Sequence, residues 1–390
     1  METIGDRVRK RRKLAGQTQQ DLRRASGVSL RTIQNLEQDA GQVPRLETLH
    51  KLAAALRTTT SYLLGSEQEP GHGPVQGTRH IWADVRSAIL APPQAPDMPP
   101  PTLEGVRGAL KRLEPVFAGD KFDSLAVSLP PLLRDAEALG TEGRAVRTRA
   151  LQLAGWLMVQ TRNFDVAEVA LDRADDDATD PIANASTFNT RSWLLLRQGK
   201  LSEARELAIK WSDDLEPRRI TRASEDQLAA WGWALLRLSA AAVRDHRLGE
   251  AEDALKYAGV AATALGTEVQ PQGDFLRTFG PVTVAIKKGE NASILGHFDD
   301  VLKIAETVPK AGLRPTSNNM NRHRLDRANA YAQTRHYGEA IELLGRVYRA
   351  SPQWLPNQSF ARDIVSTVVE KRRTLTPELR SLAEVVGLPA

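Results

Sequence analysis

The sequence contains no cysteine, which excludes disulfide bonds and thiolate metal sites. It also has no run of about 18 apolar residues, so we expect no transmembrane helix. The charged opening METIGDRVRKRRK is not followed by an apolar segment, so we expect no signal peptide either. Together these absences favour a cytoplasmic protein.

Signals for β-strands are scarce as well, because β-branched residues seldom alternate with polar ones. Apolar residues instead recur at intervals of three and four along most of the chain, which is the period of an α-helix. We therefore predict an all-α protein. A chain of 390 residues exceeds what one core usually holds, so we expect more than one structural unit.

Positive charge is concentrated at the start of the chain. Residues 1–65 carry 12 Lys and Arg against 6 Asp and Glu, although the net charge of the whole chain is only +5. The other 325 residues are therefore almost neutral. A compact basic module attached to a neutral body is typical of a protein that binds nucleic acid.

A Gly- and Pro-rich linker follows this module. The stretch APPQAPDMPPP, residues 91–101, has six prolines in eleven positions, which is too many for a helix. Between the Gly-rich and Pro-rich parts, IWADVRSAIL can form one short helix. We predict four segments, namely a basic domain at 1–65, the linker at 66–102, a helical repeat domain at 103–356 and capping helices at 357–390.

The body contains an internal repeat. Residues 163–174, 200–211, 247–258 and 336–347 each begin with a polar residue and an aromatic or Leu, and an Ala follows the latter by three positions. These alanines are Ala167, Ala204, Ala251 and Ala340. A weaker copy lies at 120–129, and the copy expected within 287–303 is poor. The frame resembles tetratricopeptide repeats (TPR), which implies a TPR-like α-solenoid; a generic helical bundle is the alternative.

Local signals in the basic module predict a turn between two short helices. Thr18 and Asp21 form a capping box, Gly27 allows a left-handed turn, and Ser29 caps the next helix. In that helix Ile33 and Leu36 share one face, which we expect to be buried. The opposite face carries polar side chains of the kinds that pair with base edges in the major groove. They are Arg31, Gln34, Asn35 and Gln38, with Thr32 beside them.

The first helix of the module, TIGDRVRKRRKLAG, places Ile4, Val8 and Ala15 on one face. It also has six basic residues whose repulsion we expect a bound polyanion to relieve. A solvated surface helix is the alternative, but it would need acidic partners one turn away, and only Asp6 is near.

The basic module resembles the helix-turn-helix of the XRE/Cro–phage-repressor family. The resemblance is carried by RVRKRR, by TQ at the start of the second helix, by GVS at the turn, by TIQNLE, and by PRLETLHKLAAAL. It implies five short helices, the last around Tyr62–Leu64, and sequence-specific binding to double-stranded DNA. The recognition helix would be Ser29–Gln38, lying in the major groove.

The resemblance also implies individual contacts. Gln19 matches a residue that contacts phosphate and braces the recognition helix, and Arg12 and Thr18 match further phosphate contacts. The DNA-binding residues predicted from the family and from the helix face are Arg12, Thr18, Gln19, Ser29, Leu30, Arg31, Thr32, Gln34 and Asn35. Leu30 departs from the family's usual polar residue and would contact a thymine methyl group. Proteins of this class commonly dimerise, so we expect a homodimer.

A helix-turn-helix joined to a TPR-like body resembles peptide-responsive bacterial regulators of the RRNPP type. That resemblance implies a peptide, small-molecule or protein ligand on the concave face. The side chains projected onto that face are Gln152, Trp156, Asn189, Trp193, Arg197, Trp233, Arg244, Arg322, Asn329 and Gln333. The alternative is that the tryptophans are inter-repeat core and the others are ordinary surface residues. The polar stretch 317–324 is expected to be an exposed turn.

No motif indicates catalysis. The seven histidines show no metal-ligand spacing, and no phosphate-binding or dinucleotide loop is present, so we expect no enzyme, no metal and no cofactor. The expected function is therefore that of a transcriptional regulator. The alternative is a TPR scaffold whose helix-turn-helix serves protein contact.

Overall fold

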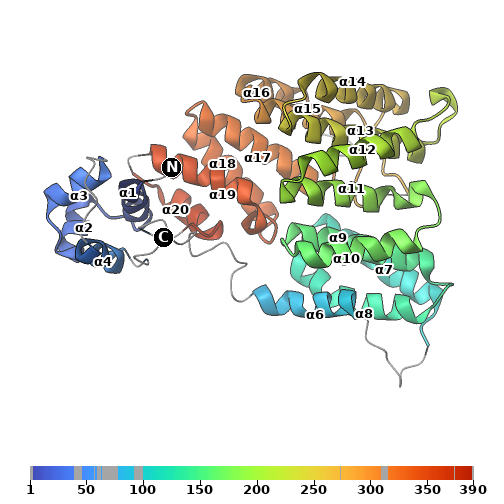
Figure 1. The fold of residues 1–390 in the computed structure, drawn as a ribbon, viewed down its shortest axis with the longest axis horizontal. Coiled ribbons are helices and arrows are strands. Elements are labelled where there is room, and N and C mark those ends of the chain that lie inside the picture. The colour runs from blue at the N-terminus through green and yellow to red at the C-terminus, as the bar shows by residue number, and fades with distance from the viewer. Residues whose placement is uncertain are drawn as a thin grey trace. The chain divides into compact units, whose positions relative to one another are not determined.

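The computed structural model describes residues 3–38, 46–56, 58, 63, 78–91, 100–272, 274–308, 315–372 and 374–388. All regular elements in these ranges are helices, which confirms the all-α prediction (Figure 1). They fall into two compact units: a first unit of residues 1–78 with 335–390, and a second unit of residues 79–334. The four predicted segment boundaries remain predictions. None of the described helices is long and apolar enough to span a membrane.

The first unit joins the two ends of the chain. Its core is built from apolar residues at helical spacing, among them Val8, Leu22, Ile33 and Leu52, which are completely buried. Of the predicted last short helix of the basic module, only Leu63 lies within the described residues, and it is buried. The helices of this unit are α1 (Ile4–Leu14), α2 (Gln19–Ser26), α3 (Leu30–Glu37), α4 (Leu46–Ala55), α18 (Tyr337–Ala350), α19 (Ser359–Lys371) and α20 (Pro377–Val385), with the 3-10 turn η2 (Leu355–Asn357).

The second unit consists of antiparallel helix pairs, together with the predicted linker helix, which forms as α6. Small residues allow the paired helices to approach closely: Gly155 on α9 faces Leu171 on α10, and a Cβ built on Gly155 would lie 3.0 Å from that side chain. The helices are α6 (Thr78–Leu90), α7 (Leu103–Ala118), α8 (Phe122–Ala138), α9 (Arg144–Gln160), α10 (Phe164–Asp177), α11 (Pro181–Gln198), α12 (Leu201–Leu215), α13 (Glu225–Arg244), α14 (Leu248–Leu265), α15 (Pro281–Ile294), α16 (Phe298–Thr307) and α17 (Ser317–Gln333), with the 3-10 turn η1 (Ile220–Arg222).

One backbone turn recurs at six places in the described chain. A residue with positive φ is followed by a residue with φ near −85° and ψ near 65°, and the next helix begins directly after it. The turn also occurs at the weak copy in 120–129 and at the poor copy in 287–303. The positive-φ residues are Asp120, Arg162, Gly199, His246, Gly296 and Arg335.

The polar stretch 317–324 was expected to be an exposed turn, and this expectation is wrong. It forms the first two turns of α17, and Asn321 and His323 within it are buried. The stretch is too polar for its sequence to suggest a buried helix face.

Candidate functional site

The turn between α2 and α3 has the local structure that the sequence predicts. The Oγ1 of Thr18 accepts the backbone N–H of Asp21 at 3.1 Å, and the Asp21 carboxylate accepts the N–H of Thr18 at 2.9 Å. Bonds from Thr18 hold the pKa of Asp21 below its usual value. Gly27 has φ +69°, and the Ser29 hydroxyl accepts the N–H of Thr32 at 3.1 Å. These caps fix where α2 ends and where α3 begins.

Helix α3 presents a polar face to solvent. Ile33 and Leu36 are buried, as predicted, whereas Arg31 and Asn35 are exposed. Ser29 and Gln38 are exposed as well, and Leu30, Thr32 and Gln34 are half-buried. The helix is therefore held by its apolar side while its guanidinium and amide groups stay available for hydrogen bonds.

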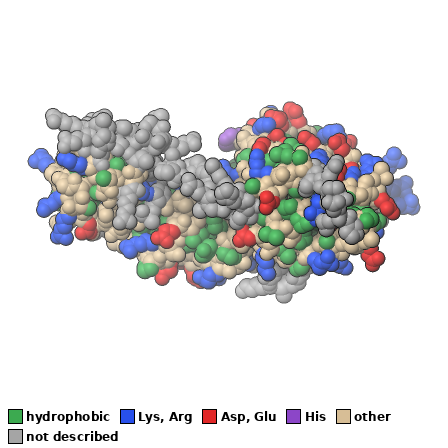
Figure 2. Space-filling view, turned by 90° about the horizontal axis from the view of Figure 1, so that it is seen from below, with side chains coloured by type: hydrophobic (Ala, Val, Ile, Leu, Met, Phe, Trp, Pro, Cys, Tyr) green, Lys and Arg blue, Asp and Glu red, His purple; other side chains and the backbone are tan. Residues whose placement is uncertain are grey.

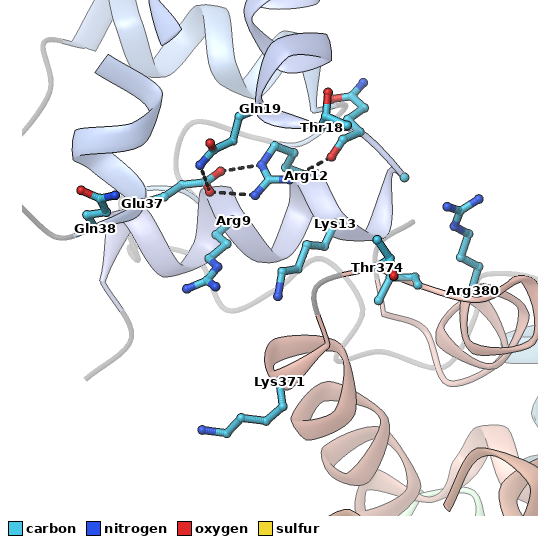
Figure 3. A pocket seen from close by; sticks show the side chains of 13 residues that line it. Arg9, Arg12, Lys13, Thr18, Gln19, Glu37, Gln38, Lys371, Thr374 and Arg380 are labelled. Carbon is cyan, nitrogen blue, oxygen red and sulfur yellow. Dashed lines mark hydrogen bonds and ion pairs between the residues drawn. The ribbon is translucent and has the colours of Figure 1, made fainter. Parts of the chain in front are cut away.

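A buried carboxylate at the end of α3 ties three segments together (Figure 3). Glu37 accepts two hydrogen bonds from Arg12, at 2.6 and 2.7 Å, and one from the Gln19 amide at 2.8 Å. The Arg12 guanidinium also donates to the carbonyl oxygen of Gln17 at 2.9 Å. Only 3% of the Glu37 side chain and 11% of the Arg12 side chain are exposed. Arg12 and Gln19, which we predicted as phosphate contacts, thus also brace α3 from α1 and α2.

Sequence reasoning missed Glu37 as a functional residue. The signal was available, because TIQNLE ends in an acid while the first helix is dense in bases. Arg12 and Glu37 are 25 residues apart and lie on different helices, so the pair falls outside a window of one helical turn.

The expectation that repulsion within α1 needs a polyanion is wrong, because the helix finds internal partners. Besides the Arg12 ion pair, the Arg7 Nε donates to the carbonyl oxygen of Leu63 at 3.0 Å. A nitrogen of the Arg11 guanidinium donates to the carbonyl oxygen of Leu56, also at 3.0 Å. Carbonyl groups left free at the ends of helices accept such bonds, and a sequence pattern does not show them.

Ala15, the C-cap of α1, is exposed. Leu14, the last residue of the helix, is buried.

Lys13 makes the longest-range of these contacts. Its Nζ donates to the carbonyl oxygens of Val369, Glu370 and Arg372 at 3.3, 3.0 and 2.8 Å. These carbonyl groups belong to the last residues of α19 and its C-cap, where the helix dipole favours a cation. Burial of the amine lowers its pKa.

Several side chains expected on an open concave face are instead in the core. Trp156 stacks edge-on against Phe117 at a centroid distance of 4.6 Å. The Gln152 amide donates to the Thr187 hydroxyl at 3.0 Å and is completely buried. For Trp156 this is the inter-repeat packing that the alternative interpretation describes.

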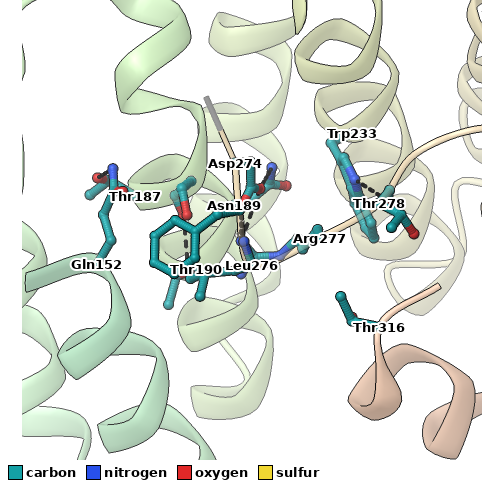
Figure 4. Close-up of polar contacts among 12 residues, drawn as sticks. Gln152, Thr187, Asn189, Thr190, Trp233, Asp274, Leu276, Arg277, Thr278 and Thr316 are labelled. Carbon is teal, nitrogen blue, oxygen red and sulfur yellow. Dashed lines mark hydrogen bonds and ion pairs between the residues drawn. The ribbon is translucent and has the colours of Figure 1, made fainter. Parts of the chain in front are cut away.

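The described residues between α14 and α15, 266–272 and 274–280, cover two more of these side chains, those of Asn189 and Trp233 (Figure 4). Asn189 donates to the carboxylate of Asp274 at 3.2 Å, and the Trp233 indole donates to the carbonyl oxygen of Thr278 at 3.0 Å. The cavity beside Asn189 and Trp233 measures about 10 Å³, which is room for one water molecule at most. The structure therefore closes this part of the expected ligand site with the chain's own backbone.

The remaining predicted ligand residues keep some solvent access. The Arg197 guanidinium lies 5.0 Å from the Trp193 ring, and burial together with the nearby Arg162 and Arg322 lowers its pKa to about 9. It therefore stays charged at neutral pH. Contacts of the other residues include those of Arg244 with Glu290 at 2.7 Å, Arg322 with Asp326 at 3.9 Å, Asn329 with Ser293 at 3.5 Å and Gln333 with Asn329 at 3.5 Å.

On the face shown in Figure 2, Lys and Arg side chains predominate among the charged groups at the left end, where the helix-turn-helix residues lie. In a comparison with family models, residues 8–63 match a helix-turn-helix family. Comparisons with curated proteins and with solved structures gave no match. The segment that holds α2 and α3 is thus a helix-turn-helix of the XRE type, and a DNA-binding regulator is the kind of protein that it supports.

Proposed function

We propose that the protein is a sequence-specific transcriptional regulator that inserts α3 into the major groove of DNA. The observation that carries the proposal is the exposed polar face of α3, held in place by the Arg12–Glu37–Gln19 network. Arg31 would pair with the O6 and N7 atoms of guanine, and Asn35 with adenine. Leu30 would contact a thymine methyl group, while Ser29, Thr32 and Gln34 would flank these contacts.

Phosphate contacts would hold this helix in register. Thr18 and Gln19 stand at the start of α2, and Arg12 lies directly behind them. Such contacts fix the orientation of the protein on the duplex but carry no sequence information.

We further propose that the protein acts as a homodimer. One module makes few base contacts, and two modules on a pseudo-palindrome would lie about 34–36 Å apart, one turn of DNA. The six recurring turns support a TPR-like solenoid as the body, which would serve dimerisation and the sensing of a ligand. The partly accessible group around Trp193, Arg197 and Arg322 is the best remaining place for that ligand.

The decisive experiment combines Arg31→Ala with Asn35→Ala. Target duplexes would first be selected from a random library with the unmodified protein, and affinity then measured by fluorescence anisotropy. Each bidentate pair discriminates by about 1–3 kcal/mol, so the double change should weaken binding to the selected site at least roughly 30-fold. Binding to unrelated DNA should change much less.

A matched control is Gln20→Ala with Arg24→Ala, since both side chains are exposed on α2 and the same chemical groups are removed. If the α3 variant loses no more affinity than this control, α3 is not the recognition helix. If the unmodified protein selects no sequence at all, the module serves protein contact instead.

A further inference from the structure

The first unit contains a cleft of about 940 Å³ between the helix-turn-helix helices and the C-terminal helices α19 and α20 (Figure 3). One wall is formed by α1, the start of α2 and the end of α3. The other is formed by Lys371, Thr374, Leu375 and Arg380. Five cationic side chains line it, together with one carboxylate, that of Glu37. The cationic residues are Arg9, Arg12, Lys13, Lys371 and Arg380.

The single carboxylate does not neutralise this cleft. Both carboxylate oxygens of Glu37 accept hydrogen bonds from Arg12 or Gln19, and the positive charge of Arg12 balances the charge of Glu37. Arg9, Lys371 and Arg380 are exposed, and no carboxylate of the described residues forms an ion pair with them. Cations gathered in one cleft attract a polyanion.

Two contacts set the position of the C-terminal wall. Lys13 binds three carbonyl oxygens at the end of α19, which keeps Lys371 beside α1. The guanidinium of Arg380 lies over Gly16, where a Cβ would be 3.1 Å from its Cζ atom. Gly16 precedes Thr18, the N-cap of α2, by two residues. Arg380 therefore stands next to the place where the proposed function puts DNA phosphates.

We propose that Lys371 and Arg380 contact the phosphate backbone of the DNA that α3 reads, so that the DNA-binding surface includes the C-terminal helices. This inference rests on the proposed function. A DNA backbone fits better than a small anion, because the cleft borders both the start of α2 and the exposed Gln38 at the end of α3.

The test compares Lys371→Gln plus Arg380→Gln with Arg346→Gln plus Arg349→Gln in the full chain. The control pair is exposed on α18, in the same unit and outside the lining of the cleft, and it removes the same charge. Affinity would be measured against salt concentration on a selected duplex and on a scrambled one. Equal melting temperatures would establish that both variants are folded.

We expect the cleft variant to lower the slope of log affinity against log salt by about 1.8, since each phosphate contact contributes about 0.9. If the two lines meet near 1 M salt, the loss at about 0.1 M is roughly 60-fold on both duplexes. Preference for the selected sequence should persist. Lys371→Arg plus Arg380→Lys should retain the slope.

The outcomes separate this inference from the proposed function. If the Arg31 and Asn35 changes abolish specificity while the cleft variant keeps the slope of the control, the inference is overturned and the function stands. If the cleft variant instead loses only binding of inorganic phosphate, the cleft is a small-anion site and the inference is again overturned. If the unmodified protein binds no DNA, both fail.

Discussion

Replacing Glu37 by glutamine should destabilise the helix-turn-helix far more than the loss of a surface ion pair would. The substitution keeps the shape of the side chain but leaves the Arg12 guanidinium, only 11% exposed, without its counter-charge. Breaking one side of a buried ion pair costs about 3–5 kcal/mol, whereas exposed pairs contribute about 0–1 kcal/mol. The NH2 group that replaces one carboxylate oxygen also cannot accept a hydrogen bond, so at least one donor of Arg12 or Gln19 is left without its acceptor, at about 1–3 kcal/mol. Both routes are consistent with a loss of about 3 kcal/mol.

Hydrogen exchange followed by mass spectrometry would measure this locally, on peptides that cover α1 to α3 of the full chain. A loss of about 3 kcal/mol corresponds to exchange roughly 150-fold faster for amides that open with the module. Glu342→Gln is the matched control, because Glu342 pairs with Arg346 across 3.8 Å on the exposed side of α18. It should change protection by less than about 0.5 kcal/mol.

The reasoning would be refuted if Glu37→Gln also cost less than about 1 kcal/mol, since the pair would then behave as a solvated one. A second variant checks the cause. Arg12→Met with Glu37→Leu removes both charges and should recover most of the lost protection, because no buried charge is left unpaired.

Two further predictions concern the second unit. Gly232→Ala would place a Cβ 1.9 Å from the Phe279 ring. It should lower the free energy of unfolding by about 2–4 kcal/mol and make residues 266–280 sensitive to proteolysis. Gly259→Ala should do neither, because no atom lies within 4 Å of its Cβ. Equal proteolysis of the two variants would contradict this. For His323, burial and nearby cations lower the pKa from 6.5 to about 4. Between these two pH values the unfolded chain binds a proton that the folded state does not, so stability is lost as pH falls from 6.5 to 4. The free energy of unfolding, measured by urea denaturation, should fall between pH 7 and 4 by about 3 kcal/mol less in His323→Phe than in the unmodified protein. An equal fall in the two proteins would show that the imidazole is not the cause.

The features predicted well from the sequence are local ones. The caps at Thr18 and Ser29, the glycine at the α2–α3 turn, and the buried pair Ile33 and Leu36 depend on residues within one or two helical turns. Their physical cause lies in hydrogen bonds and side-chain periodicity that a short window contains.

The features that were missed depend on contacts between distant segments. Lys13 bonds to backbone carbonyls 356 to 359 residues away, and any residue type can supply a carbonyl. No sequence pattern indicates that Asp274 and Thr278 cover Asn189 and Trp233. Helical periodicity places those two residues on one side of their helices, but it does not say what covers that side.

The bond from Lys13 to the end of α19 also has a consequence for the order of synthesis. The two partners are separated by 356 residues, and residues 79–334 between them form the other unit. At about 5–20 residues per second, α1 leaves the ribosome roughly 20–70 s before the carbonyl groups that bind Lys13. The cleft that we assign to DNA therefore forms only after α19 and α20 have been synthesised, so a nascent chain that already carries α3 still lacks its C-terminal wall.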